Sequence, residues 1–270
     1  MKTIVRRNLL YKTGVEYGDY TANIAFGCSH GCNYPCYAFL IAKRFGKVKT
    51  IEDWKKPLLV SNALELLDKE LPKLKGKISS VHLCFSTDPF MYEYVEVGEL
   101  SMSVIERINK EGIPCSVLTK GILPKRLSSF SKENQYGITL ISLDENVRCR
   151  VEPAAAPIEQ RIGALEFLHN QGCYTWASIE PFPTPNLCEV DLLALLKRVS
   201  FVDKIVFGRL HYNRLVSQYK GYKAFYDDCA RTVIDFCSKN KKYCHIKKGT
   251  ISSKELLDYY EEKSFSFERL

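Results

Sequence analysis

Short runs of β-branched and aromatic residues alternate with longer amphipathic runs along this chain. Such alternation is typical of repeated strand–helix units that build a parallel sheet. The pattern predicts strands at 20–26, 78–85, 114–118, 136–141, 173–179 and 202–207. Amphipathic runs predict helices at 37–45, 61–71, 98–110, 124–130, 157–172, 189–199 and 221–239, with a last short helix from about residue 252.

Polar groups follow every predicted strand. They are a cysteine-rich loop, Asp88, Lys120, Ser142, Glu180 and Arg209. Six strand–helix units make an incomplete version of the eight-stranded α/β barrel, whose functional residues lie at the carboxyl ends of its strands. We therefore expect an α/β fold, a partial (β/α)6 TIM-like barrel at 20–240. Residues 1–19 are predicted as an N-terminal extension, and 241–270 as a tail with a short helical appendage.

Composition narrows the class of protein. The 270 residues suffice for one large α/β domain, and no apolar run approaches the length of a membrane span. The first seven residues lack the apolar core of a signal peptide. Eleven cysteines in a chain without an export signal indicate reduced thiols, metal ligation and a cytoplasmic location. The net charge of +8 is compatible with a nucleic-acid partner, although many basic proteins bind none.

The loop after the first predicted strand carries the most specific chemistry. Cys28, Cys32 and Cys36 lie within nine residues. A tetrahedral zinc site would need a fourth ligand from elsewhere, such as His30 or His245. Three thiolates can instead hold three irons of a [4Fe–4S] cube and leave the fourth iron open to a small molecule. We consider the cube the better interpretation and keep the zinc loop as the alternative.

At this point the chain resembles radical S-adenosylmethionine (SAM) enzymes, in their spore photoproduct lyase-like branch. The resemblance covers roughly residues 20–210. Its segments, in order, are Gly27-Cys28-Ser29-His30-Gly31-Cys32 with Cys36-Tyr37-Ala38, Ser86-Thr87-Asp88-Pro89-Phe90, Leu118-Thr119-Lys120, Ile141-Ser142-Leu143, and Val151-Glu152-Pro153-Ala154 with Pro157 and Arg161.

One feature departs from the family pattern. The usual spacing between successive cysteines is three residues and then two, whereas here the second gap is Asn33-Tyr34-Pro35. The extra residue implies either a cluster of altered geometry or a site that has lost its cluster. We favour a working cluster, because Cys36 keeps the Tyr37-Ala38 that follows the third cysteine in the family pattern.

The resemblance implies that Cys28, Cys32 and Cys36 bind a [4Fe–4S] cluster and that SAM chelates its open iron. An electron then splits SAM into methionine and a 5′-deoxyadenosyl radical, which abstracts hydrogen from a substrate. The residues implied around SAM are Asp88, Lys120, Ser142, Glu152, Arg161, Glu180 and Tyr37.

Each of these residues also has a structural alternative. Asp88 can start a turn, Lys120 can be a solvated loop lysine, and Ser142 can be a capping hydroxyl. Glu152 and Arg161 can form a surface pair instead of a clamp on the SAM carboxylate. The remaining two alternatives are strand-end solvation for Glu180 and core packing for Tyr37.

Cys84, at the end of the second predicted strand, is a candidate catalytic hydrogen-atom donor, with an inert buried thiol as the more common outcome for a free cysteine. No other cysteines show a paired short spacing, so we predict no second cluster. The remaining cysteines are Cys115, Cys149, Cys173, Cys188, Cys229, Cys237 and Cys244.

The leading function is therefore a radical SAM enzyme, of lyase or transferase type, that needs an external electron donor and acts on a nucleic acid or nucleotide. Several tyrosines near predicted loops are available to stack bases. They are Tyr92, Tyr94, Tyr212, Tyr219 and Tyr222. The alternatives are a peptide or small-molecule substrate, and a non-catalytic Fe–S or zinc protein that recognises nucleic acid.

Overall fold

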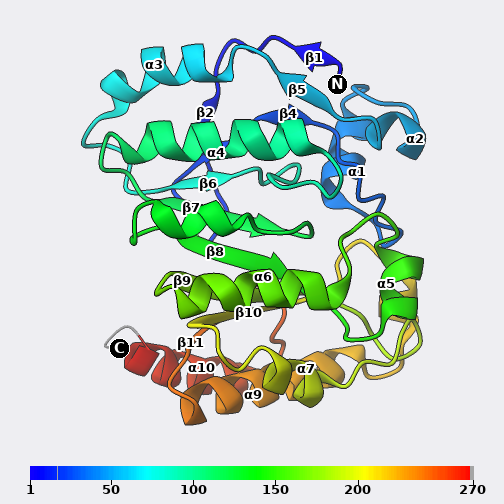
Figure 1. Cartoon of the computed structure of the whole chain (residues 1–270). Coiled ribbons are helices and arrows are strands. Elements are labelled where there is room, and N and C mark those ends of the chain that lie inside the picture. Colours follow the sequence, from blue (N-terminus) through cyan, green and yellow to red (C-terminus); the bar gives the residue numbers. More distant parts are fainter. Residues whose placement is uncertain (17, 268–270) are drawn as a thin grey trace.

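The computed structural model describes residues 1–16 and 18–267, and its centre is an eight-stranded sheet (Figure 1). The strand order is β11-β10-β9-β8-β7-β6-β3-β2. All neighbouring strands run parallel except β2, which pairs antiparallel with β3. In chain order the bounds are β2 Leu10–Lys12, β3 Tyr20–Ala22, β6 Val81–Leu83, β7 Cys115–Thr119, β8 Gln135–Thr139, β9 Tyr174–Phe182, β10 Lys204–Arg209 and β11 Tyr243–Ile246.

Most of the helices lie along one face of this sheet or pack on the helices there (Figure 1). They are α3 (Ala63–Leu74), α4 (Val95–Asn109), α6 (Ile158–Asn170), α7 (Leu192–Arg198), α9 (Tyr222–Lys239) and α10 (Lys254–Phe267). Alternate strand residues such as Val117, Ile138 and Ile205 join the helices in the main hydrophobic core. Burial of this apolar surface is the main force that holds the sheet and helices together.

The opposite face of the sheet is polar and aromatic. Trp176 on β9 is paired in register with Gly137 on β8 and Lys204 on β10. The Lys204 ammonium lies 4.8 Å from the Trp176 ring centroid, over its face. A Cβ on Gly137 would stand 2.4 Å from that ring, so only glycine leaves room for the indole. His82 on β6 also lies on this face, 6.4 Å from Trp176 between ring centroids.

The loop that follows the edge strand β2 contacts the other edge strand, β11. Glu16, in the loop between β2 and β3, lies 2.8 Å from the His245 Nε2 of β11. The same carboxylate accepts a hydrogen bond from the backbone N–H of Lys248. The sheet therefore curls on itself, and this link, here called the seam, joins residues more than 200 positions apart.

A second, three-stranded sheet supports the start of the cysteine loop. Its order is β1 (Thr3–Ile4), β5 (Leu58–Val60) and β4 (Ala25–Phe26), and β4 ends directly before Gly27. The remaining elements are α1 (Tyr37–Arg44), α2 (Ile51–Trp54), the 3-10 helix η1 (Lys125–Ser129), α5 (Glu145–Val151) and α8 (Arg214–Gln218).

The structure confirms the predicted α/β fold, with its six parallel strands in one sheet, and adds β2 and β11 to that sheet. The single strand predicted at 20–26 is instead two, because the chain leaves the main sheet at Asn23 and pairs with β5. The extension 1–19 contributes β1 and β2, and the tail 241–270 contributes β11. Among the described residues, no helix has the length and apolarity needed to cross a bilayer.

Candidate active site

The cysteine loop joins β4 to α1 at the carboxyl edge of the strands. Gly27 adopts φ +90°, and a Cβ there would stand 2.7 Å from the Trp54 carbonyl oxygen, so the loop needs glycine at this turn. The Cys28 N–H donates to the same Trp54 oxygen at 3.0 Å. Cys28, Cys32 and Cys36 are all partly exposed free thiols.

A buried ionic cluster lies directly beside this loop. The Glu152 carboxylate is 3.3 Å from Nη1 of Arg161 and 3.7 Å from Nζ of Lys120. Tyr34, between Cys32 and Cys36, donates its hydroxyl hydrogen bond to the same carboxylate at 2.8 Å. Burial raises the pKa of Glu152, but the charges of Lys120 and Arg161 outweigh it and hold that pKa below its usual value.

The burial of this cluster excludes two of the structural alternatives, one for the Glu152–Arg161 pair and one for Lys120. Glu152 and Arg161 are each 1% exposed, so the surface-pair interpretation is wrong. Lys120 is 18% exposed and its Nζ lies 5.6 Å from the Tyr34 ring centroid, so it is not a solvated loop lysine. Burial lowers the pKa of Lys120, but the neighbouring acidic groups Cys32 and Glu152 raise it above its usual value, so the ammonium stays charged.

Asp88 holds three loops of this edge together. Its carboxylate accepts hydrogen bonds from the Thr119 hydroxyl at 2.6 Å, from the Phe90 N–H at 2.9 Å and from the Lys120 N–H at 2.8 Å. The Phe90 bond is the turn role foreseen for Asp88. Asp88 also lies 3.4 Å from Nδ1 of His30, in the cysteine loop.

His30 is accordingly a structural link. Its Nε2 accepts the Tyr92 N–H at 3.2 Å, which assigns the ring proton to Nδ1, facing Asp88. Burial lowers the pKa of His30, more than the nearby Asp88 charge raises it. Because both ring nitrogens are engaged, His30 does not serve as the fourth zinc ligand here, and His245 is engaged with Glu16.

Ser142 and Glu180 lie at the ends of the neighbouring strands. The Ser142 hydroxyl accepts the Asp144 N–H at 3.0 Å, a turn role before α5. Glu180 lies within β9, because that strand continues to Phe182 past its predicted end. Its side chain packs over Gly208, where an added Cβ would come within 2.9 Å of the Glu180 Cδ. Burial raises the pKa of Glu180, although Lys247 acts in the opposite direction.

Tyr37 and Cys84 occupy different environments. Tyr37 is 46% exposed, so core packing is the wrong interpretation, and its hydroxyl donates to the Phe85 carbonyl beyond β6. Cys84 is 4% exposed, and its thiol lies 3.7 Å from the Ala22 carbonyl oxygen. Burial raises the pKa of Cys84 to about 12, so the group is a protonated thiol at neutral pH. Its role as a hydrogen-atom donor stays a prediction.

The residues around the cysteine loop fit an iron–sulfur cluster. Three free thiols supply the ligand type that such clusters use, and each binds a different iron, so the sulfurs need not converge on one point. In the described part of the chain, no three His, Cys, Asp or Glu side chains converge as ligands of a single metal ion. The buried Ser29 hydroxyl, between two of the cysteines, has no hydrogen-bond partner, which suits a donor to a bound group.

Sequence comparisons find two uncharacterized relatives. One, from Methanocaldococcus jannaschii, is 28% identical over 184 residues, which are 67% of this chain and 66% of the relative, slightly under two thirds of its length. The other, from Acidianus two-tailed virus, is 24% identical over 216 residues, 74% of this chain and 70% of the relative. No protein-family model matches the chain.

Solved structures give the clearer result. A spore photoproduct lyase structure with bound AdoMet and dinucleoside spore photoproduct superposes with a TM-score of 0.64 at 13% identity, over 90% of this chain and 80% of that one. SuiB of Streptococcus suis, bound to S-adenosylmethionine, gives 0.55 at 11% identity, over 90% of this chain and 49% of that one. The chain therefore has the radical SAM fold in its spore photoproduct lyase-like form.

Proposed function

We propose that the protein is a radical SAM enzyme acting on a nucleic acid or nucleotide. The observation that carries the proposal is the buried ionic cluster of Lys120, Glu152 and Arg161, which Tyr34 ties to a loop of three free cysteines at the carboxyl edge of the sheet. Cys28, Cys32 and Cys36 would hold the [4Fe–4S] cluster. When bound, the cluster supplies the electron that splits SAM into methionine and a 5′-deoxyadenosyl radical, which takes a hydrogen atom from the substrate.

The chain's own residues position and shield this chemistry. Burial raises the pKa of Cys32 to about 11, and the positive charge of Lys120 acts in the opposite direction, toward the thiolate that an iron–sulfur cluster would bind. Glu152 fixes the Tyr34 hydroxyl and with it the residues between Cys32 and Cys36. Arg161 also donates to the Thr139 carbonyl at 2.9 Å, so it anchors the ionic cluster of Lys120, Glu152 and Arg161 to β8. Ser142, Glu180 and Tyr37 lie at neighbouring strand ends or at the start of α1, where they would contact SAM.

A nucleic-acid or nucleotide substrate is supported by the net charge of +8 and by the fold shared with a spore photoproduct lyase that was solved with a dinucleoside spore photoproduct. The reaction would be of lyase or transferase type, with an external electron donor. No membrane partner is proposed.

The experiment is anaerobic reconstitution with iron and sulfide, reduction in the presence of SAM, and measurement of 5′-deoxyadenosine. We expect product from the wild type and none from Cys36→Ala. Cys149→Ala is the matched control, because Cys149 is an exposed thiol on α5 outside the loop, and it should behave as the wild type. A cluster that forms but leaves SAM intact would replace the enzyme proposal with a non-catalytic Fe–S nucleic-acid-binding protein. Zinc in place of iron would replace it with a zinc loop.

A further inference from the structure

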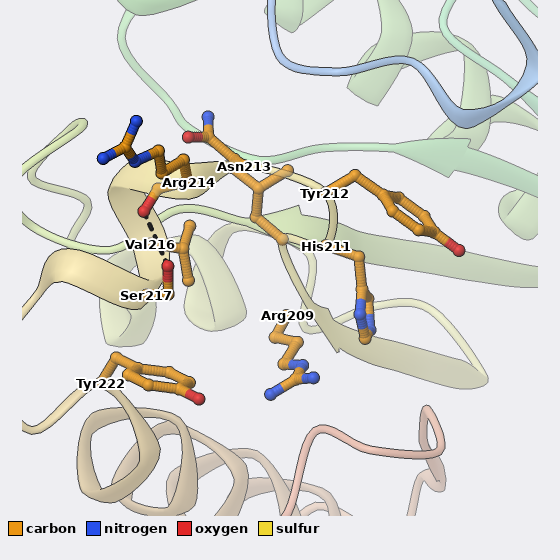
Figure 2. Close-up of a pocket in the computed structure, with 9 residues that line it drawn as sticks. Arg209, His211, Tyr212, Asn213, Arg214, Val216, Ser217 and Tyr222 are labelled. Atoms are coloured by element: carbon orange, nitrogen blue, oxygen red, sulfur yellow. Dashed lines mark hydrogen bonds between the residues drawn. The ribbon is translucent and has the colours of Figure 1, made fainter. Parts of the chain in front are cut away.

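A cavity of about 310 Å³ lies beyond the carboxyl end of β10, between that strand, α8 and the start of α9 (Figure 2). Its nine lining residues include two arginines, one histidine and two tyrosines, and none of them is acidic. A cavity of this size accepts part of a ligand, such as one phosphate with its sugar.

Arg209, the last residue of β10, is the cation at the centre of this cavity. Its Nε is buried without a hydrogen-bond partner, and its guanidinium has no ion pair with any described residue. Lys120 and Arg161, at neighbouring strand ends, both have the carboxylate of Glu152 as a partner. A guanidinium that loses water without gaining an anion pays a desolvation cost, which a bound anion removes.

Other polar groups surround the guanidinium. Figure 2 shows the Tyr222 hydroxyl directed toward Arg209 from one side and the His211 ring on the other, whereas Arg214 and Asn213 point away at the rim. Tyr212 stands next to the cavity with 75% of its surface exposed and with φ +60°, so its ring projects into solvent. An anion bound to Arg209 could accept from Tyr222, and a base attached to it could stack on Tyr212.

In the sheet, Arg209 is paired in register with Phe182 of β9, two residues beyond Glu180. Lys120 and Lys247 both act on the pKa of Glu180, and Lys247 and Arg209 both lower the pKa of His211, after the larger effect of its burial. The Lys247 and Glu180 side chains also both pack against Gly208, directly before Arg209. A ligand extending from the Arg209 cavity along this edge therefore runs toward the candidate SAM site.

We propose that Arg209, with Tyr222, forms a phosphate-binding subsite for a nucleic-acid strand or nucleotide, adjacent to the radical SAM centre. The inference rests on the proposed function, because it names a contact to the substrate of that same site. The shared ligand chemistry is a phosphate ester, and its source is either the backbone of a single strand or a free nucleotide.

The test is fluorescence anisotropy of a fluorescein-labelled deoxythymidine dodecamer with the full chain, reconstituted but without SAM or reductant. Arg209→Gln should weaken binding about ten- to hundredfold, as expected for a lost charge-assisted contact, and lower the salt dependence by about one phosphate. Tyr222→Phe should weaken it less. Arg126→Gln is the matched control, because Arg126 is an exposed arginine of η1, and it should change binding less than twofold.

Competition with thymidine monophosphate and thymidine identifies the source of the phosphate. If the monophosphate competes better than thymidine, and Arg209→Gln removes that difference, the site takes a free nucleotide. If neither competes while the dodecamer depends on Arg209, the site takes a backbone phosphate. If the wild type and Arg209→Gln bind the dodecamer equally well, the proposal is overturned. It is also overturned if the wild type binds neither the dodecamer nor thymidine monophosphate. SAM cleavage by the wild type is measured separately, so the proposed function and this subsite can fail independently.

Discussion

Replacing Glu152 by glutamine removes one negative charge from a buried cluster that holds two cations. The amide keeps the size of the side chain, and its carbonyl oxygen can still accept the Tyr34 hydroxyl. What the variant loses is the attraction to Arg161 and Lys120, at 3.3 Å and 3.7 Å in the native structure. We therefore expect a loss of stability that reports charge compensation and not packing.

The magnitude follows from burial and distance. At an effective dielectric constant of about 20, each of the two attractions is worth about 4–5 kcal/mol before the cost of desolvation. Removing one partner of a buried pair leaves the other charge uncompensated, which typically costs about 3–5 kcal/mol. Glu152 and Arg161 are each 1% exposed, so solvent cannot repair the loss. Glu152→Gln should lower the free energy of unfolding by about 3–5 kcal/mol.

Urea denaturation of the unreconstituted protein under reducing conditions measures this difference, with an unchanged slope showing that the two-state comparison is valid. Glu159→Gln is the matched control, because Glu159 pairs with Arg198 at 2.7 Å on the surface, where it is 69% exposed. That variant should lose less than about 1 kcal/mol. The charge argument also predicts that Glu152→Gln/Arg161→Gln, which restores the net charge, is more stable than Glu152→Gln alone.

A loss below about 1 kcal/mol for Glu152→Gln would refute the reasoning, since it would place the cluster in a medium that screens like the surface. A double variant less stable than the single one would refute it independently. That second comparison decides the case even if Glu152→Gln is too unstable for a full denaturation curve.

Two further predictions concern the scaffold. Gly121→Ala should lower the free energy of unfolding by about 3 kcal/mol or more, because the added Cβ would stand 1.6 Å from the Phe90 carbonyl oxygen. Gly163→Ala, on an open helix face, should raise it by about 0.5–1 kcal/mol in the same urea assay. Burial, assisted by the charge of Lys204, lowers the pKa of His82 to about 3. In the unfolded chain this histidine is protonated below about pH 6.5, whereas in the folded chain it stays neutral down to about pH 3. Stability should therefore fall as pH falls through this window, by about 2 kcal/mol at pH 5 from this residue, and His82→Asn should remove that part. Equal pH dependence in both proteins would contradict it.

The sequence predicted which residues lie at the carboxyl edge of the sheet better than it predicted the contacts that they make there. Parallel strands bring their carboxyl ends to one side, so strand-end residues such as Lys120 were expected near the cysteine loop. The bond between Tyr34 and Glu152 spans 118 positions and has no local sequence signal. Of the four contacts of Asp88, only the local bond to Phe90 was foreseen, because the bonds to Thr119, to the Lys120 N–H and to His30 depend on the finished fold.

Short strands were missed for a related reason. β2 and β11 have three and four residues, too few to show an alternating pattern, and they form because an exposed edge of the sheet is available to them. Asn23 ends β3 because its side chain accepts from the Ser86 N–H and hydroxyl beyond β6, which turns the chain toward β5. The sequence also does not show that, among the described residues, Arg209 has no carboxylate as an ion-pair partner.

At the seam, the loop after β2 meets the edge strand β11 through a side chain and not through a backbone ladder. Elsewhere neighbouring strands are joined by backbone ladders, whereas at this line the Glu16 carboxylate contacts a histidine and accepts from a backbone amide. Parting it breaks a few exchangeable bonds and leaves every strand pair intact. The curl of the sheet can therefore widen or narrow while every strand stays paired with its neighbours.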